Sequence, residues 1–247
     1  MNTISISRVF QPIPLQPNAL IQLDEPASHH LARVLRATIN DTLIIFNGDG
    51  GEYLGIITRI DKKNVMVQLQ EYLTKKTESP LELYLAQGIS RGEKMDYTIQ
   101  KAVELGVKKI LPLFTERSTV KLDKERREKK RQHWESIAIS ACEQSGRLCV
   151  PEIFMPQSLE KALVSLQADW YFVLSPTATH QLKKSPVQKT QRVVLLIGPE
   201  GGLSETEIDY VSQCGFLPLN LGPRILRTET AAVAAITALQ CFFGDMS

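Results

Sequence analysis

Short apolar runs alternate with amphipathic segments over the last two thirds of the chain. Apolar runs that end at turns are typical of strands buried on both faces of a parallel sheet. Such runs predict strands at 81–86, 109–114, 170–174, 193–197 and 216–221. Between them, amphipathic spacing predicts a helix at 92–105, a charged run that continues into a helix is expected at 124–143, a capped helix at 204–214, and an Ala-rich helix, apolar on most faces, from about 228. This alternation indicates an α/β domain.

The first 72 residues follow a different pattern. Strands are expected at 42–46, 53–60 and 65–69, and the glycine-rich segment 47–51 between the first two is a strong hairpin signal. Many short strands with one small helix indicate a β-barrel. The polar segment 74–80, which ends in proline, reads as a linker. We therefore expect two domains, 1–73 and 74–247.

A small basic helix is expected at 29–36, with Ser28 as its cap. Its apolar face would hold Leu31, Val34 and Leu35. The polar face would present three basic side chains: His30, Arg33 and Arg36. This face is either simply solvated or a contact for RNA phosphates, which arginine grips with paired N–H groups.

Two predicted strands end at glycine-containing turns, Gly198–Gly202 and Gly222–Arg224. Ser204 stands three residues before Glu207, which predicts a capping box at the start of a helix. Loops after the carboxyl ends of parallel strands bind ligands in open α/β sheets, and glycine lets backbone come close to them. Each turn by itself can be an ordinary tight turn. Two turns that frame one capped helix favour a ligand pocket.

Composition narrows the function classes. The chain has 247 residues, 43% hydrophobic content and a net charge of +2, so basic surface must come from local clusters. The segment 121–131 is one such cluster, with seven basic and three acidic residues, which fits a solvated helix face or a stripe along phosphates. The four cysteines lack CxxC spacing, which argues against zinc and disulfides and fits the cytoplasm. No apolar run is long enough for a signal core or a membrane span.

Long motifs carry a resemblance to a known family. The segments IGPEGGLSETE (197–207) and LGPRILRTETA (221–231) closely resemble the C-terminal signature of the ribosomal small subunit methyltransferase E family. Other matching segments are HHLARVLR (29–36), SRGEKMDYTIQKAVELG (90–106), LFTERSTVKLD (113–123) and ACEQSGR (141–147). The resemblance implies a SPOUT-type parallel sheet with a trefoil knot, preceded by a PUA-like RNA-binding barrel. It also implies a homodimer that methylates N3 of a 16S rRNA uridine with S-adenosylmethionine, with ACEQSGR beside the active-site cleft.

This resemblance and the strand ends together suggest site residues. The cofactor is expected at three strand-end loops: Leu174, Ser175, Gly198, Glu200, Gly201, Gly202, Leu219, Leu221, Gly222 and Leu226. RNA contacts are expected from eight basic residues: Arg8, His30, Arg33, Arg36, Arg91, Lys94, Arg147 and Arg224. No metal is expected.

Arg227 and Glu229 are the predicted catalytic residues. Uridine N3 lies on the pairing edge and carries a proton, so the base must be unpaired and its negative charge stabilised. Arg227 suits that stabilising role. Glu229 can take the proton or fix Arg227 by an ion pair, and the second role is favoured because a carboxylate paired with arginine is a weak base. The proton acceptor stays open.

Other functions are compatible with parts of the pattern. A related SPOUT enzyme acting on tRNA or another rRNA position is the nearest alternative. A non-catalytic RNA-binding assembly factor, whose glycine-rich loops are only turns, is another. A dinucleotide enzyme is disfavoured because the chain contains neither GxGxxG nor a Walker A segment.

Overall fold

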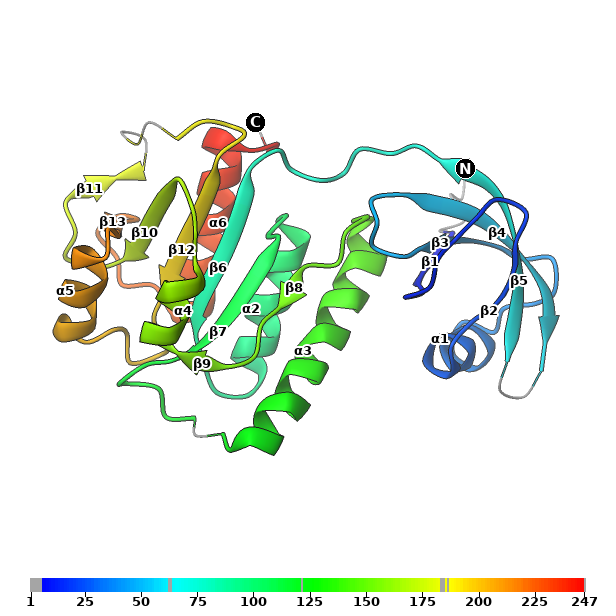
Figure 1. Ribbon diagram of the computed structural model, residues 1–247, viewed down its shortest axis with the longest axis horizontal. Helices are drawn as coiled ribbons and strands as arrows, with labels where there is room; N and C mark the ends of the chain where they lie inside the picture. The colour runs from blue at the N-terminus through cyan, green and yellow to red at the C-terminus, as the bar shows by residue number, and fades with distance from the viewer. Residues whose placement is uncertain (1–5, 62–63, 121, 183–184, 186, 247) are drawn as a thin grey trace. The chain divides into compact units, whose positions relative to one another are not determined.

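A computed structural model describes residues 6–61, 64–120, 122–182, 185 and 187–246 (Figure 1). Contacts between residues divide the chain into two units. Unit 1 comprises Met1–Glu78 together with Cys142–Val150, and unit 2 comprises Ser79–Ala141 together with Pro151–Ser247. The sequence pattern placed a single boundary after residue 73. It did not indicate that the segment 142–150 makes its contacts with the N-terminal part of the chain.

Unit 1 is built on a sheet that contains, within the described residues, five strands in the order β1-β3-β4-β5-β2. Their bounds are β1 Ser7–Phe10, β2 Leu20–Gln22, β3 Thr42–Phe46, β4 Glu52–Ile60 and β5 Val65–Leu73. β3 and β4 pair antiparallel, which confirms the predicted hairpin, whereas β1 pairs parallel to β3. Alternate residues of β5 (Val65, Val67 and Leu69) are fully buried in the core of this unit. The period-2 pattern thus identified the inner face of the sheet.

The small helix of unit 1 differs from its prediction. α1 (Glu25–His29) begins after Asp24, whose carboxylate accepts from the Ala27 amide at 2.8 Å, and it continues as a π-helix, η1 (His30–Val34). Ser28 is not the cap but a buried residue inside the helix. The wider π turn shifts the following residues off the expected face. Leu31 is buried as predicted, whereas Val34 and Leu35 are 60% and 46% exposed.

Unit 2 is a parallel sheet flanked by helices. Within the described residues the strand order is β11-β13-β10-β12-β6-β7-β8, with β9 beside β7, and every pair is parallel. The predicted strands are β6 (Glu82–Gly88), β7 (Lys109–Phe114), β10 (Trp170–Leu174), β12 (Arg192–Ile197) and β13 (Leu217–Asn220). The additional short strands are β8 (Glu152–Ile153), β9 (Gln157–Ser158) and β11 (His180–Gln181), which were not predicted because two residues carry no period.

The helices of unit 2 cover both faces of the sheet. They are α2 (Glu93–Glu104), α3 (Lys124–Ser145), α4 (Leu159–Ser165), α5 (Glu205–Gln213) and α6 (Thr228–Phe243). Figure 1 shows α2 and α6 behind the strands and α4 in front of them. All but α4 were predicted, and the last turn of α3 belongs by its contacts to unit 1.

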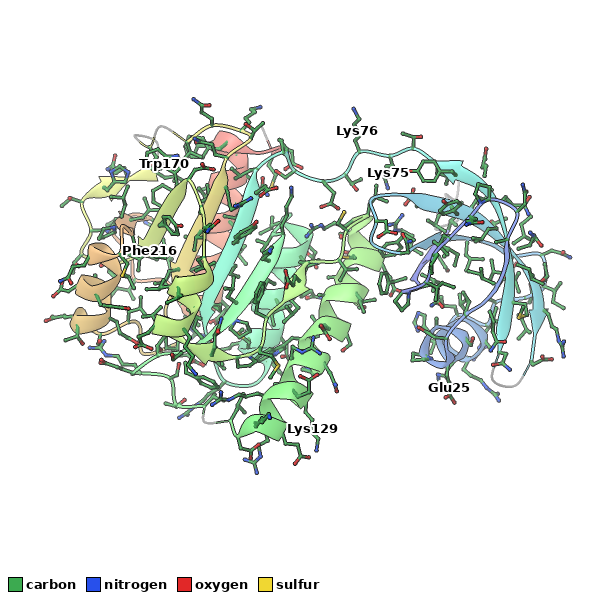
Figure 2. All side chains as sticks on the ribbon, viewed as in Figure 1. Glu25, Lys75, Lys76, Lys129, Trp170 and Phe216 are labelled. Atoms are coloured by element: carbon green, nitrogen blue, oxygen red, sulfur yellow. The ribbon has the colours of Figure 1, made fainter. Side chains whose placement is uncertain are left out.

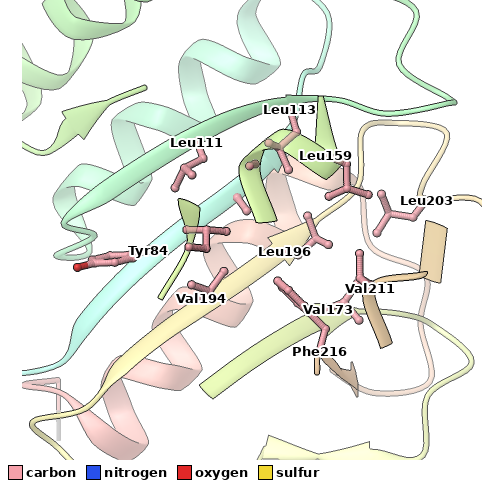
Figure 3. Packing of buried hydrophobic residues seen from close by; sticks show 13 residues of the cluster. Tyr84, Leu111, Leu113, Leu159, Val173, Val194, Leu196, Leu203, Val211 and Phe216 are labelled. Carbon is pink, nitrogen blue, oxygen red and sulfur yellow. The ribbon is translucent and has the colours of Figure 1, made fainter. Parts of the chain in front are cut away.

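Successive residues of the unit 2 strands point to opposite faces of the sheet, and both faces are buried. On one face, Tyr84, Val194 and Leu196 pack with residues of α4 and α5 and with Phe216 (Figure 3). The residues between them, such as Leu83, Leu85 and Leu195, are fully buried as well. A strand buried on both faces explains why these runs are apolar throughout.

The capping box of α5 is formed as predicted. The Ser204 hydroxyl accepts from the Glu207 amide at 3.1 Å, and the Glu207 carboxylate accepts from the Ser204 amide at 2.9 Å. Gly215 follows the helix with a φ of 94°, as expected of a residue that ends one. A trefoil knot requires one segment of the chain to pass through a loop formed by another, and strand order alone does not establish this. The knot therefore stays a prediction.

Candidate functional site

A cavity of about 320 Å³ lies in unit 2 at the carboxyl ends of three neighbouring strands, β13, β10 and β12. The segment after β10, the loop between β12 and α5, and the segment between β13 and α6 supply its walls. This is the edge at which parallel sheets bind ligands. We call this cavity the strand-end pocket.

All ten residues predicted at the cofactor line the strand-end pocket: Leu174, Ser175, Gly198, Glu200, Gly201, Gly202, Leu219, Leu221, Gly222 and Leu226. They come from segments as far as 52 residues apart in sequence, so it is the tertiary structure that brings them together. Their role in binding a cofactor stays a prediction.

Two glycines in this pocket are required by close backbone contacts. A Cβ on Gly198 would lie 2.7 Å from the carbonyl carbon of Gly202 and 2.7 Å from the Leu203 nitrogen. A Cβ on Gly201 would lie 3.1 Å from Cβ of Arg117. The loop therefore folds back on itself and against the segment after β7 because these residues have no side chain.

A buried polar cluster joins the two glycine-containing segments under the pocket. The Thr228 hydroxyl donates to the Gly198 carbonyl oxygen at 2.6 Å and accepts from Nε2 of Gln87 at 3.0 Å. Gln87 is fully buried at the end of β6, and its Nε2 also lies 3.3 Å from the Gly198 carbonyl. Thr228 lines the pocket, yet its role was not predicted, since nothing in the spacing distinguishes this threonine from its neighbours.

Glu200 connects the pocket loop to the start of α2. Its carboxylate accepts from the Arg91 amide at 3.0 Å and lies 3.6 Å from Nζ of Lys94. Burial acts to raise the pKa of Glu200, but the amides of Arg91 and of Glu200 itself, together with Lys94, hold that pKa below its ordinary value. Arg91 and Lys94, predicted as RNA contacts, thus lie beside the strand-end pocket.

Arg117 is a pocket residue that the sequence did not single out. It lines the strand-end pocket, and its Nη1 donates to the Gly201 carbonyl oxygen at 3.1 Å. It reaches the pocket from the segment after β7, which is distant in sequence from the two signature segments. Two signals point to it: the place of β7 in the same parallel sheet, and the family-matching segment 113–123 that contains Arg117.

The predicted catalytic residues flank Thr228 at the start of α6. Arg227 is exposed and occupies the position before the helix, while Glu229 is half-buried in its first turn. Neither lines the strand-end pocket. Among the described residues, no ion pair joins Glu229 to Arg227, and the buried Oε2 of Glu229 has no hydrogen-bond partner. The expected ion pair is therefore absent from this structure.

Two predicted RNA contacts are engaged inside unit 1. The side chain of Arg147 is 4% exposed and pairs with Glu78 at 2.6 Å. Arg8 pairs with Glu52, donates to the Arg147 carbonyl oxygen at 2.9 Å, and lies over the Phe46 ring. Their predicted role as RNA ligands does not fit this burial, because Arg147 and both Nη atoms of Arg8 are directed to internal partners. All of the ACEQSGR segment after Ala141 likewise belongs to unit 1 by its contacts.

The remaining predicted RNA contacts lie on the surface. His30, Arg33 and Arg36 are exposed in unit 1, and Arg36 has a left-handed φ of 54°. Arg224 is exposed and lines the strand-end pocket in unit 2. The basic segment 122–131 is partly neutralised by local ion pairs of Arg126, Lys129 and Arg131, for example Lys129 with Glu125 and Arg131 with Glu128. Lys121, which also belongs to that predicted cluster, lies outside the described residues.

The described residues contain neither a candidate metal-binding cluster nor a helix that could span a membrane. Among the described residues, no three His, Cys, Asp or Glu side chains are grouped so as to hold a metal ion. Over the same residues, no helix has the length and apolar character that crossing a membrane requires.

Comparison with known proteins identifies the two parts of the chain. Residues 77–240 match the RNA methyltransferase domain family, and residues 23–70 match the RNA methyltransferase PUA domain family. The chain is 43% identical over 243 residues to ribosomal RNA small subunit methyltransferase E of Buchnera aphidicola from Schizaphis graminum, covering 98% of both chains. It is 34% identical to the Bacillus subtilis protein of the same name, covering 85% of this chain and 86% of that one.

Solved structures agree with these relatives. A Legionella pneumophila methyltransferase, solved with the bound cofactor SAM, superposes with a TM-score of 0.95 at 44% identity, covering 98% of this chain and all of that one. Ribosomal RNA small subunit methyltransferase E from Neisseria gonorrhoeae, bound to S-adenosyl methionine, superposes with a TM-score of 0.92 at 35% identity and the same coverage. With its SPOUT-type parallel sheet, its PUA-like N-terminal part and this degree of identity, the chain belongs to the ribosomal RNA small subunit methyltransferase E family.

Proposed function

We propose that this protein transfers a methyl group from S-adenosylmethionine to N3 of a uridine in the 16S RNA of the small ribosomal subunit. The observation that carries the proposal is the strand-end pocket, in which all ten predicted cofactor residues meet. Two relatives of known structure, 44% and 35% identical to this chain, hold that cofactor.

The strand-end pocket fits a nucleoside sulfonium. Its volume of about 320 Å³ lies at the small end of ligand pockets, which span roughly 300–1,000 Å³. Leu219, Leu221 and Leu226 supply apolar walls, and the glycine-containing loop supplies backbone groups that can read the edge of an adenine. The bound cofactor would supply an electrophilic methyl group. The pocket would hold it in line with the acceptor, which can contribute on the order of 7–11 kcal/mol to lowering the barrier.

Arg227 is the proposed catalytic residue toward the RNA base. Methylation at N3 removes a proton and leaves negative charge on the uracil oxygens unless a cation stabilises it. The exposed Arg227 side chain adjoins Thr228, whose hydroxyl contacts the pocket loop. A guanidinium at this position can approach a base that enters from solvent.

Glu229 is the proposed positioning residue for Arg227. Its buried Oε2 has no partner among the described residues, so an acceptor is available for a guanidinium that moves toward it. Pairing would form when the RNA base fixes Arg227, as catalytic hydrogen bonds often tighten only in the substrate complex.

The RNA would be held by exposed basic residues of both units. His30, Arg33 and Arg36 are candidates in unit 1, and Arg91, Lys94 and Arg224 are candidates near the strand-end pocket. We also propose a cytoplasmic homodimer, as the family resemblance implies. The partly exposed small side chains along α6, such as Val233 and Ala234, support close helix packing. Light scattering of the purified protein tests the dimer.

Methyl transfer to ribosomal particles tests the function. Small subunits from a strain that lacks this gene are incubated with the protein and labelled S-adenosylmethionine, and mass spectrometry of RNA fragments locates the methyl group. We expect one new methyl on N3 of one uridine, and a loss of at least a hundredfold in rate for Arg227→Ala with cofactor binding retained. Absence of transfer by the unaltered protein, or a methyl at another position, would overturn the proposal.

A further inference from the structure

A second cavity, of about 640 Å³, lies in unit 2 at the carboxyl end of β7. Its walls come from the segment after β7, the first turn of α3, β9 and α4. Its polar lining consists of hydroxyls, one amide, one carboxylate and two cations: Thr115, Ser118, Ser158, Gln157, Glu116, Arg127 and Lys161. We call this cavity the β7 basin.

The β7 basin and the strand-end pocket share one segment of chain. β7 lies beside β6, which pairs with β12, so both cavities open at the same edge of the parallel sheet. Glu116 and Ser118 line the basin, while Arg117 between them lines the strand-end pocket. A polymer that reaches the pocket along this edge therefore passes the basin.

Arg127 is held in the basin with part of its guanidinium available. Its Nε donates to the Leu122 carbonyl oxygen at 3.1 Å, and its guanidinium carbon lies 4.7 Å from the centre of the Phe114 ring. Within the described chain, neither Nη atom of Arg127 has a hydrogen-bond partner. Because carbonyl and ring already fix the side chain, little rotamer freedom is lost when a ligand binds it.

Lys161 supplies a second cation, from α4. It lines the basin, its side chain is exposed, and among the residues that the structure describes its Nζ has no ion pair. The lining also contains one carboxylate, Glu116, whose Oε1 accepts from the Thr206 hydroxyl at 3.3 Å. The lining thus carries two cations and one carboxylate, a formal net charge of +1, beside several hydroxyls, which favours an anion with several oxygens.

We infer that the β7 basin binds the sugar-phosphate backbone of the RNA substrate, with Arg127 and Lys161 on one phosphodiester. The volume admits a nucleotide rather than an isolated phosphate. The apolar side chains of Val120 and Leu122 line the same basin and can face a sugar. The inference rests on the proposed function, because an RNA substrate brings phosphates to this edge of the sheet.

Binding of a short single-stranded RNA, labelled with a fluorophore and measured by anisotropy without cofactor, tests the inference. The variants are Lys161→Gln and the double variant Arg127→Gln/Lys161→Gln. We expect affinity to fall about threefold for the single variant and at least tenfold for the double one. The slope of log affinity against log salt should decrease by about 0.7, the value for one phosphate of a single strand.

A matched control removes two charges elsewhere. Lys129 projects from α3, 72% exposed and paired with Glu125 (Figure 2), and Lys189 is exposed beyond β11. The double variant Lys129→Gln/Lys189→Gln should change affinity less than twofold. An equal loss in this control would show that only net charge matters and would overturn the inference, as would unchanged binding by the basin variants.

Two further measurements separate the possible failures. Thermal unfolding shows whether Arg127→Gln, which loses contacts to Phe114 and Leu122, still folds, and Lys161→Gln alone keeps the test valid if it does not. Methyl transfer by the unaltered protein is measured in parallel. RNA binding that depends on the basin without any methyl transfer would refute the proposed function alone. Methyl transfer with no dependence on the basin would refute this inference alone.

Discussion

The Thr228 hydroxyl donates to the Gly198 carbonyl oxygen at 2.6 Å, across 30 residues of chain. This hydrogen bond is buried, and Thr228 accepts in turn from Gln87 at the end of β6. It connects the loop after β12 with the start of α6, so the two glycine-containing segments are held as walls of one pocket.

Removing the hydroxyl should weaken the strand-end pocket. Thr228→Val removes the 2.6 Å hydrogen bond to the Gly198 carbonyl, which keeps only the longer contact from Gln87 Nε2 at 3.3 Å. Loss of one buried hydrogen bond costs about 0.5–1.5 kcal/mol. We expect a lower melting temperature and at least a tenfold loss of affinity for S-adenosylmethionine by calorimetry. Thr228→Ser retains the hydroxyl and should stay within threefold of the unaltered protein. Equal behaviour of the two variants would contradict the role given to this hydrogen bond.

Two glycines of the same loop should respond differently to alanine. At Gly198 the new Cβ would lie 2.7 Å from backbone atoms, so the loop must shift and cofactor affinity should fall tenfold or more. Gly202 has a φ of 70° with nothing within 4 Å of its would-be Cβ, so Gly202→Ala should cost only the left-handed strain of about 1–2 kcal/mol. Calorimetry and thermal unfolding of both variants test this. A larger loss of affinity at Gly202 would show that the loop is placed differently.

The Glu78–Arg147 pair should make stability depend on acid pH. Burial acts to raise the pKa of Glu78, but Arg147 and the amides of Cys149 and Leu148 hold that pKa below its ordinary value of 4.5. A lowered folded-state pKa means that the stabilisation is complete above pH 4.5 and is lost as the pH falls through the folded value.

Glu78→Gln tests this dependence. At neutral pH the variant leaves the nearly buried Arg147 guanidinium without its carboxylate, which should cost about 3–5 kcal/mol. From about pH 5 to about pH 3 its free energy of unfolding should fall less steeply than that of the unaltered protein. Denaturant titrations at several pH values measure both, and parallel pH profiles would contradict the assignment.

The cysteines should differ in reactivity. Desolvation raises the pKa of the buried Cys142 thiol to about 12, so at pH 8 only about one thiol in ten thousand would be ionised. Cys214 and Cys241 are exposed. Iodoacetamide at pH 8, followed by peptide mass spectrometry, should modify these two and spare Cys142 until the protein unfolds. Early modification of Cys142 would show that this part of unit 1 opens in the native state.

The sequence by itself determined the elements whose pattern is local. Examples are the apolar runs of β7 and β10 and the Ser204–Glu207 capping box. Each could be predicted from residues that lie close together in the sequence. The family signature was also readable from contiguous segments, and with it the residues that meet in the strand-end pocket.

Only the tertiary structure decided what depends on distant contacts. The burial of Arg8 and Arg147, the place of Arg117 in the strand-end pocket and the β7 basin each arise where segments far apart in sequence meet. The π turn at His30–Val34 is local, but no pattern of residues in the sequence predicted it. The sequence gives the same residue type for a charged side chain that faces water and for one that pairs with a buried carboxylate. The role of such a side chain is set by the dielectric and the partners that the fold provides, which no local pattern records.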